Sequence, residues 1–214
     1  MAVDLTDGLT PPPEEPVDLF EVLGQLPLMT DNFYLRMQAH NIAITDRSLN
    51  QMERDLLERE LEREHTPVDE ADFLNAWSQM WVFGFFELMR TWNALASKFR
   101  NHSRKLMRGD PRAQAPLIAP RWVAENPAGA ETALDEAIKR ANSLRRMLAE
   151  VRTGLAKHQI QGSSTGTPHP GYGRISPLNG SISWRVMYEN AEDLISRRDL
   201  ADECRAMLNK VRRL

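Results

Sequence analysis

The spacing of apolar residues predicts a long central helix over residues 68–107. Apolar side chains recur there at steps of three and four positions, which is the helical repeat; they are Leu74, Trp77, Trp81, Phe85, Leu88, Trp92, Leu95 and Phe99. Further apolar residues widen this stripe almost around the helix: Phe73, Met80, Phe83, Phe86 and Met89. A helix that is apolar on most sides must be surrounded by other helices or by another subunit. We interpret the aromatic residues as core packing, not as a platform for a cofactor or for stacked bases.

A second long helix is predicted over about residues 128–158, after a connection that contains Gly109 and four prolines. Its apolar stripe consists of Leu134, Ile138, Ala141, Leu144, Leu148, Val151 and Leu155. Upstream, residues 31–64 have a helical pattern that we expect to form two pieces. Apolar Leu49, Met52 and Leu56 form one side, and charged residues that include Glu53 form the other, as in a surface helix. A short amphipathic segment over residues 19–26 should dock on this body.

The only strand pattern lies near the C-terminus. Ile182, Trp184 and Val186 alternate with polar residues, and Asn179-Gly180 just before them is a type I′ turn signal. We therefore expect a hairpin over about residues 172–187, followed by a last helix over about 190–213. The predicted fold is mainly α, a helical bundle with a small C-terminal β-hairpin. It forms a single domain over residues 17–214, after a disordered acidic and Pro-rich N-terminus over residues 1–16.

The composition is that of an ordinary globular protein and does not identify a function. The chain has 42% hydrophobic and 27% charged residues and a net charge of −3, an ordinary globular balance. Charge is uneven, because residues 1–31 contain no Lys or Arg whereas residues 98–121 are strongly basic. Either an acidic arm covers a basic surface or both faces are simply solvated.

Cysteine content and hydropathy bear on the cellular compartment. Cys204 is the single cysteine, which excludes an internal disulfide and fits the reducing cytoplasm. We see no signal peptide. The apolar stretch over residues 73–99 contains Glu87 and Arg90, so we expect a buried helix there and no membrane span.

Most catalytic motifs are absent, including the P-loop, dinucleotide-binding, zinc-protease and serine-hydrolase patterns. Glu62 and His65 have E-x-x-H spacing, but a di-iron bundle needs a second such motif and further inward-facing glutamates. We therefore expect neither a metal nor a cofactor.

The segment Arg152-Thr153-Gly154-Leu155-Ala156-Lys157-His158 is the best candidate for chemistry, at the end of the second long helix. Arginine remains charged and can hold a phosphate, and histidine exchanges protons near neutral pH. Together they could cleave RNA without a metal. The alternative is that Lys157 and His158 are ordinary cations, which a helix C-terminus favours.

This segment resembles the R-x(4–6)-H motif of the HEPN family (higher eukaryotes and prokaryotes nucleotide-binding), which lies near the end of a bundle helix. The family usually has Asn, Asp or His after the arginine, where this chain has Thr153. The resemblance covers about residues 145–160, and the predicted fold is compatible over about 68–160. It implies metal-independent RNA cleavage, with Arg152 and His158 catalytic, in a toxin–antitoxin or anti-phage role. We expect Thr153 and Lys157, with Arg100, Arg104 and Lys105 of the basic run, to contact the RNA.

The resemblance also implies a homodimer in which two motifs share one cleft. Arg152 and His158 are six positions apart. On a straight helix this step rotates about 240° and rises about 9 Å, so the two side chains would not converge within one subunit. Gly154 could loosen the turn, or a second subunit could complete the site. The alternative function is a non-catalytic helical dimerisation or interaction module with a protein partner.

Overall fold

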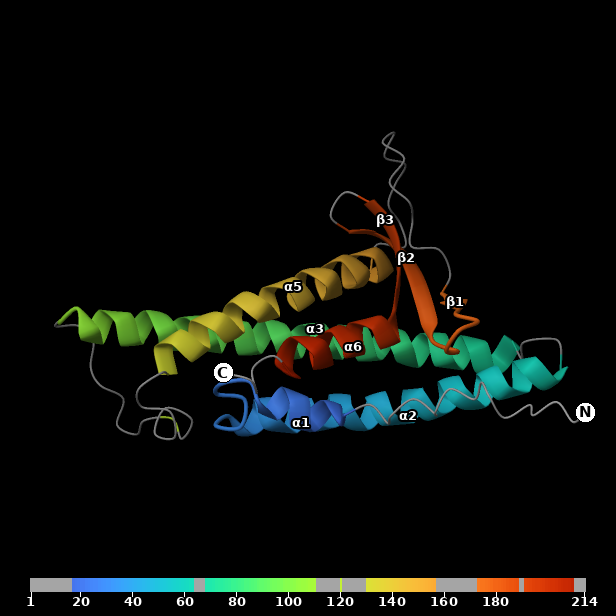
Figure 1. Cartoon of the computed structure of the whole chain (residues 1–214), viewed down its shortest axis with the longest axis horizontal. Helices are drawn as coiled ribbons and strands as arrows, with labels where there is room; N and C mark the ends of the chain where they lie inside the picture. Colours follow the sequence, from blue (N-terminus) through green and yellow to red (C-terminus); the bar gives the residue numbers. More distant parts are fainter. Residues whose placement is uncertain are drawn as a thin grey trace, which may run out of the picture.

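The computed structural model describes residues 17–63, 68–110, 120, 130–156, 173–188 and 191–209. Within these residues it is mainly helical, with a small antiparallel sheet near the C-terminus (Figure 1). The helices are α1 (Leu19–Gly24), α2 (Phe33–Arg63), α3 (Val68–Met107), α5 (Ala130–Ala156) and α6 (Arg197–Asn209). The strands are β1 (Arg174–Ile175), β2 (Ile182–Tyr188) and β3 (Ala191–Ser196). The predicted fold class is confirmed, whereas residues 1–16, predicted to be disordered, lie outside the described residues.

The two central helices follow the prediction closely. Helix α3 has the predicted bounds, and the described part of α5 lies within its predicted range. The expected division of residues 31–64 into two helices is wrong, because α2 is continuous. Its sequence contains no glycine or proline that would interrupt it. The helix begins where the Asn32 side chain accepts hydrogen bonds from the backbone N–H groups of Tyr34 and Leu35, at 3.0 and 3.1 Å.

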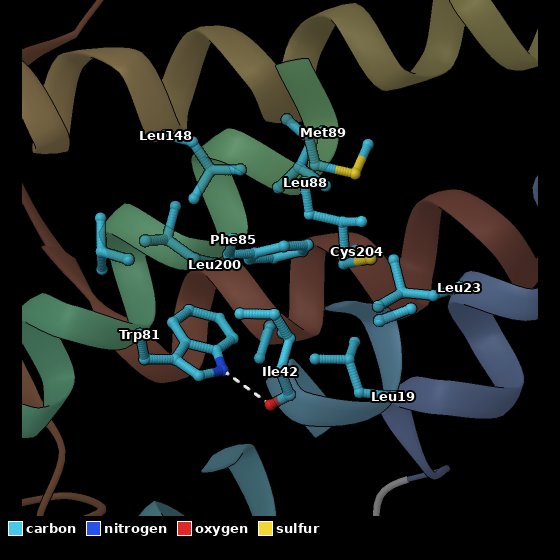
Figure 2. Packing of buried hydrophobic residues seen from close by; sticks show 14 of the residues in the cluster. Leu19, Leu23, Ile42, Trp81, Phe85, Leu88, Met89, Leu148, Leu200 and Cys204 are labelled. Carbon is cyan, nitrogen blue, oxygen red and sulfur yellow. Dashed lines mark hydrogen bonds between the residues drawn. The ribbon is translucent and has the colours of Figure 1, made fainter. Parts of the chain in front are cut away.

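The core lies where α3 meets the other helices. Figure 1 shows α1 and α2 on one side of α3, α5 on the other, and α6 in front of it. Trp81, Phe85 and Leu88 of α3 pack with Leu200 and Cys204 of α6 (Figure 2). Burial raises the pKa of the Cys204 thiol, which leaves it a small apolar side chain in this core.

Buried tryptophans also join the elements through hydrogen bonds. The indole N–H of Trp81 donates to the carbonyl oxygen of Ile42 in α2, at 3.1 Å (Figure 2). The indole N–H of Trp92 donates to the carbonyl oxygen of Pro27, between α1 and α2, at 2.7 Å. The aromatic stripe of α3 is therefore largely core, as the sequence predicted, although Phe73, Trp77 and Met80 remain exposed.

The sheet has one more strand than the hairpin that the sequence predicts. Its order is β1-β2-β3, and both pairs are antiparallel. The hairpin was expected over about residues 172–187; its first strand is β1 at Arg174–Ile175, and Tyr172 lies outside the described residues. Trp184 is fully buried, and its indole N–H donates to the Asn75 side chain of α3 at 3.4 Å, so it faces the helices.

The last helix begins later than predicted, since residues 191–196 form β3. A capping box sets the boundary. The Asp199 backbone N–H donates to the Ser196 hydroxyl at 3.0 Å, and the Ser196 N–H donates to the Asp199 carboxylate at 2.8 Å. The expectation of a helix from about residue 190 was therefore wrong. The residues after Asn209 lie outside the described part of the chain.

The β1–β2 turn differs from the predicted type I′ geometry. That geometry needs positive φ at both Asn179 and Gly180. Gly180 has φ 70°, but Asn179 is not among the positive-φ residues, so this prediction was wrong. The turn is a longer loop closed by two hydrogen bonds at 2.8 Å, from Ser176 N–H to the Ser181 carbonyl oxygen and from Gly180 N–H to the Ser176 carbonyl oxygen. Pro177 supplies the fixed φ that suits the start of such a loop.

Replacing Gly180 with alanine should destabilise the protein more than the same change at Gly109. Both glycines have φ +70°, a conformation that costs alanine about 1 kcal/mol or more. A methyl group at Gly180 would also lie 2.1 Å from the Glu53 carbonyl oxygen, whereas nothing lies within 4 Å of one at Gly109. Thermal unfolding of the two variants measures the difference. Equal losses of stability in the two variants would show that α2 moves away from the added methyl group at no cost.

Candidate functional site: the Arg152 turn of helix α5

Arg152 lies in the last described turn of α5, against an aromatic ring of α3. Its guanidinium carbon is 4.9 Å from the centroid of the Phe86 ring, within the range of a cation–π contact. Val151 and Leu155 on either side are buried and fix the turn to the core. The apolar stripe of α5, which the sequence predicted, packs in the core. This packing positions Arg152 at the edge of the α3–α5 interface.

The rest of the motif is described only in part. The helix continues through Thr153 and Gly154 to Ala156, so Gly154 does not interrupt it. Thr153 is half-buried beside Arg152. Lys157 and His158 lie outside the described residues, so the distance between Arg152 and His158 stays a prediction.

Arg152 makes no ion pair or hydrogen bond with any residue that the structure describes. Some other arginines of the long helices form ion pairs: Arg140 pairs with Glu136 one turn away, at 2.9 Å, whereas Arg145 donates to the Asn142 side chain at 3.5 Å. Phe86 holds the Arg152 side chain through the face of its ring, which leaves the guanidinium N–H groups available to an oxyanion. Five N–H donors in a planar fork suit a phosphate group.

The predicted RNA contacts at the end of α3 lie far from Arg152. Arg104 pairs with Glu131 at 2.8 Å and with Asp135 at 2.5 Å, and Arg100 pairs with Asp135 at 3.4 Å. The hydrogen bond to Glu131 is the main cause that raises the pKa of Arg104. These two arginines therefore join α3 to the start of α5. Arg104 is 18 positions from Phe86, or about 27 Å along the helix axis.

Lys105 belongs to a separate basic groove at the same end of α3. The groove has a volume of about 660 Å³ and is lined by Leu95, Lys98, Phe99, Asn101, His102, Lys105 and Pro120. Lys98 and Lys105 are exposed. The predicted site residues that the structure describes thus lie in two regions, with Arg152 and Thr153 on α5 and Arg100, Arg104 and Lys105 at the basic end of α3.

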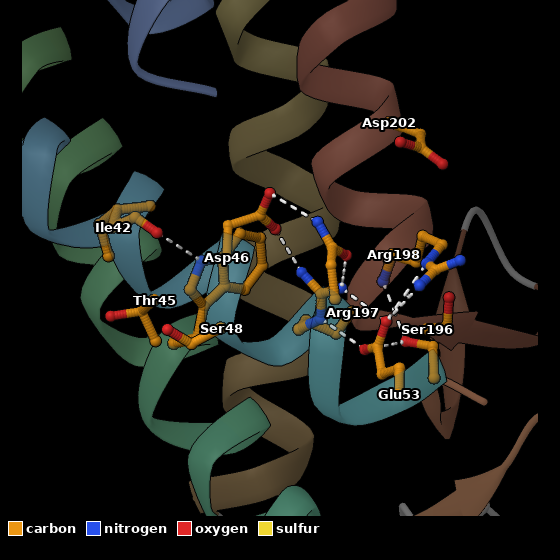
Figure 3. Close-up of polar contacts among 12 residues, drawn as sticks. Ile42, Thr45, Asp46, Ser48, Glu53, Ser196, Arg197, Arg198 and Asp202 are labelled. Carbon is orange, nitrogen blue, oxygen red and sulfur yellow. Dashed lines mark hydrogen bonds and ion pairs between the residues drawn. The ribbon is translucent and has the colours of Figure 1, made fainter. Parts of the chain in front are cut away.

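A buried ion network joins α2 to α6, and the sequence analysis missed it. Asp46 and Glu53 of α2 are 1% and 0% exposed, and Arg197 of α6 is 0% exposed. Arg197 donates to Glu53 at 2.7 and 2.8 Å, to Asn50 at 2.5 Å and to Asp46 (Figure 3). The expectation that Glu53 lies on a solvated face was wrong, because arginines of α6 neutralise it inside the protein.

Further cations and one hydroxyl complete this network. Arg198 donates to Glu53 at 2.8 Å, Arg205 donates to Asp46 at 2.6 Å, and the Ser181 hydroxyl donates to Glu53 at 2.8 Å. Burial alone would lower the pKa of Arg197, but hydrogen bonds and charges from Glu53 and Asp46 outweigh it and raise the pKa. Both carboxylates are fully engaged, so the network is a structural connection, not a pair of free acid–base groups.

The remaining observations limit the type of site. Among the described residues, no group of three or more His, Cys, Asp or Glu side chains could hold a metal ion. None of the described helices is both long and apolar enough to cross a membrane. Comparisons of the chain with models of protein families, with curated proteins and with solved structures found no match.

Proposed function

We propose that this chain is a HEPN-like endoribonuclease that uses Arg152 and His158 without a metal. The motif and the helical bundle support the proposal, and one observation carries it. Arg152 is fixed over Phe86 at 4.9 Å and has no carboxylate partner among the described residues. Arg104 and Arg140 of the same helix pair, by contrast, each hold a carboxylate.

In the proposed reaction, the 2′-hydroxyl of the substrate attacks the adjacent phosphorus. The new P–O bond forms as the bond to the 5′-oxygen of the next nucleotide breaks. His158 accepts the proton of the 2′-hydroxyl, and the leaving 5′-oxygen takes up a proton from water. Arg152 donates to the non-bridging oxygens, where negative charge increases in the transition state. The products are a 2′,3′-cyclic phosphate and a 5′-hydroxyl.

Both motif residues should be necessary for cleavage. We expect Arg152→Ala to lower the cleavage rate by about 10²–10³-fold, through lost charge stabilisation. We expect His158→Ala to lower it by about 10²–10⁴-fold, through lost proton transfer. The measurement is cleavage of a panel of structured and unstructured RNAs in excess EDTA, with identification of the cyclic phosphate. Arg152→Ala should lower the free energy of unfolding only modestly, because a cation–π contact between half-buried side chains such as Arg152 and Phe86 is worth about 0.5–2 kcal/mol.

Arg146→Ala is the matched control, because Arg146 is an exposed cation of the same helix. It should cleave like the wild type. If His158→Ala also cleaves like the wild type, a contaminating nuclease is responsible and the proposal fails.

The second candidate function is a non-catalytic interaction module. The specific observation in its favour is the exposure of Phe73, Trp77 and Met80 on α3, at 51%, 40% and 70%. Absence of cleavage by every variant and by the wild type would favour this function over the nuclease.

A further inference from the structure

Polar and charged side chains follow one edge of the interface between α3 and α5. Three contacts fix the register of the two helices: Arg104 with Glu131, Arg100 with Asp135, and Phe86 with Arg152. Residue numbers fall along α3 as they rise along α5, so the helices are antiparallel (Figure 1). We call the edge that these six residues mark the α3–α5 seam.

The charge of the α3–α5 seam changes from one end to the other. At the Glu131 end, carboxylates of α5 hold the arginines of α3. Over residues 137–156, by contrast, Glu150 is the single acid of α5, and it lies about 160° around the helix from Arg152. On the facing part of α3, over residues 86–99, Glu87 is the single acid, and it pairs with Arg90 at 2.7 Å. The part of the seam next to Arg152 therefore has no acid that offsets the arginines of α5.

Arg145 is a second arginine of α5 on this part of the seam. It precedes Arg152 by seven positions, so it lies on the same side of the helix, within about 20° and at about 10.5 Å along the axis. The side chain is half-buried. The hydrogen bond that its Nη2 donates to the Asn142 side chain, at 3.5 Å, is its only polar contact with the described residues. Most of the five N–H donors of Arg145 are therefore available to an anion.

Buried atoms without a hydrogen-bond partner are concentrated on the seam. Among the described residues there are six such side-chain atoms, and three of them lie here: Asn93 Oδ1, Arg100 Nε and Arg145 Nε. Asn93 is midway in sequence between Phe86 and Arg100, so the register puts it level with Asn142 and Arg145. Buried polar atoms of folded proteins nearly always have a partner. The middle of the seam is therefore a place where a bound molecule could supply polar groups.

We propose that Arg145 binds a second phosphate of the RNA, on the same strand as the phosphate that is cleaved at Arg152. This role of Arg145 rests on the proposed function, which puts the cleaved phosphate at Arg152. A stacked strand advances about 3.4 Å per phosphate, so the two arginines span about three nucleotides. One row of cations along a helix edge follows one backbone, whereas a duplex presents two. The substrate class is therefore single-stranded RNA that extends about three nucleotides beyond the cleaved bond.

Binding of an RNA that cannot be cleaved tests the second phosphate without the reaction. The probe is a fluorescent single-stranded RNA that is 2′-O-methylated throughout, so it has no free 2′-hydroxyl. We expect Arg145→Ala to weaken binding about tenfold and to lower the slope of log affinity against log salt by about 0.7, the contribution of one phosphate contact. The matched control is Arg146→Ala, because Arg146 is exposed and lies about 120° around the helix from Arg152; it should keep the slope. Circular dichroism checks that both variants are folded. A wild type that does not bind the probe, or an unchanged slope for Arg145→Ala, would overturn the proposal.

The length of the substrate gives a second measurement. A dinucleotide contains only the cleaved phosphate, whereas a hexanucleotide also reaches Arg145. The KM of the wild type for the hexanucleotide should therefore be about tenfold lower than its KM for the dinucleotide. Arg145→Ala should lose most of this difference through KM and not kcat, as expected for a contact that is equally strong before and during the reaction, while Arg146→Ala should keep it. A difference that persists in Arg145→Ala would contradict the second phosphate.

A duplex of the same 2′-O-methyl RNA tests the substrate class. It should bind about tenfold more weakly than the single strand, because a rigid double helix cannot follow the seam and loses one of the two phosphate contacts. Equal binding of the duplex would refute the single-stranded class. If Arg145 contributes to binding and no RNA is cleaved, only the nuclease is refuted. If RNA is cleaved and Arg145→Ala behaves like Arg146→Ala, only the second phosphate is refuted.

Discussion

Glu53→Ala should destabilise the protein by about 3–5 kcal/mol, a large part of the stability of an ordinary domain. The side chain is fully buried and accepts hydrogen bonds from Arg197, Arg198 and Ser181. Its removal leaves the Arg197 guanidinium buried with only Asp46 to balance its charge. Removal of one member of a buried ion pair typically costs about 3–5 kcal/mol, because water cannot reach the charge that remains.

Urea unfolding followed by circular dichroism measures this effect. The matched control is Glu58→Ala, which removes an exposed carboxylate from the same helix and should cost about 0.5 kcal/mol or less. The loss of stability for Glu53→Gln should lie between the losses for these two variants. The glutamine amide keeps the shape and one acceptor oxygen of glutamate, but its NH₂ group faces the arginine N–H donors and cannot accept from them. A loss for Glu53→Ala no greater than for Glu58→Ala would show that water enters and solvates Arg197.

The contrast between Glu53 and the long helices shows which parts of the fold a sequence can reveal. Helix α3 could be predicted to its ends because its core positions are apolar and recur locally. Asp46 and Glu53 follow the same spacing in α2 as Ile42, Leu49 and Leu56, so they also occupy core positions. Their arginine partners lie more than 140 positions later in the chain. No local pattern joins the two segments, so the charged residues looked solvated.

Strand β3 was missed for a different reason. Its sequence, Ala-Glu-Asp-Leu-Ile-Ser, has good helix formers and no clear alternation, and only its pairing with the long strand β2 makes it a strand. The Ser196 and Asp199 capping box was a visible signal for the later helix start. At the candidate site, the apolar stripe gave the location of Arg152 on α5. Its contact with Phe86 depends on how α3 and α5 pack, which no spacing within α5 could show.

Trp92→Ala should also destabilise the protein by about 3–5 kcal/mol, the usual cost of removing a large core aromatic side chain. Trp92 is 0% exposed, and its indole N–H holds the carbonyl oxygen of Pro27 at 2.7 Å. That bond fixes the connection between α1 and α2, where Leu28 is buried with φ 65°. A non-glycine residue in this conformation costs about 1 kcal/mol or more, so packing and the Trp92 hydrogen bond must hold it in place.

Two further variants separate packing from hydrogen bonding. Trp92→Phe keeps most of the apolar volume but leaves the Pro27 carbonyl oxygen without its donor, so it should cost less than Trp92→Ala, with about 1–3 kcal/mol from the lost hydrogen bond. Phe33→Ala is the control, because Phe33 is 71% exposed and should lose about 0.5 kcal/mol or less. Thermal and urea unfolding of the three variants give the order of their stabilities. If Trp92→Phe is as stable as the wild type, the hydrogen bond to Pro27 does not hold the strained connection, and packing of Leu28 alone must do so.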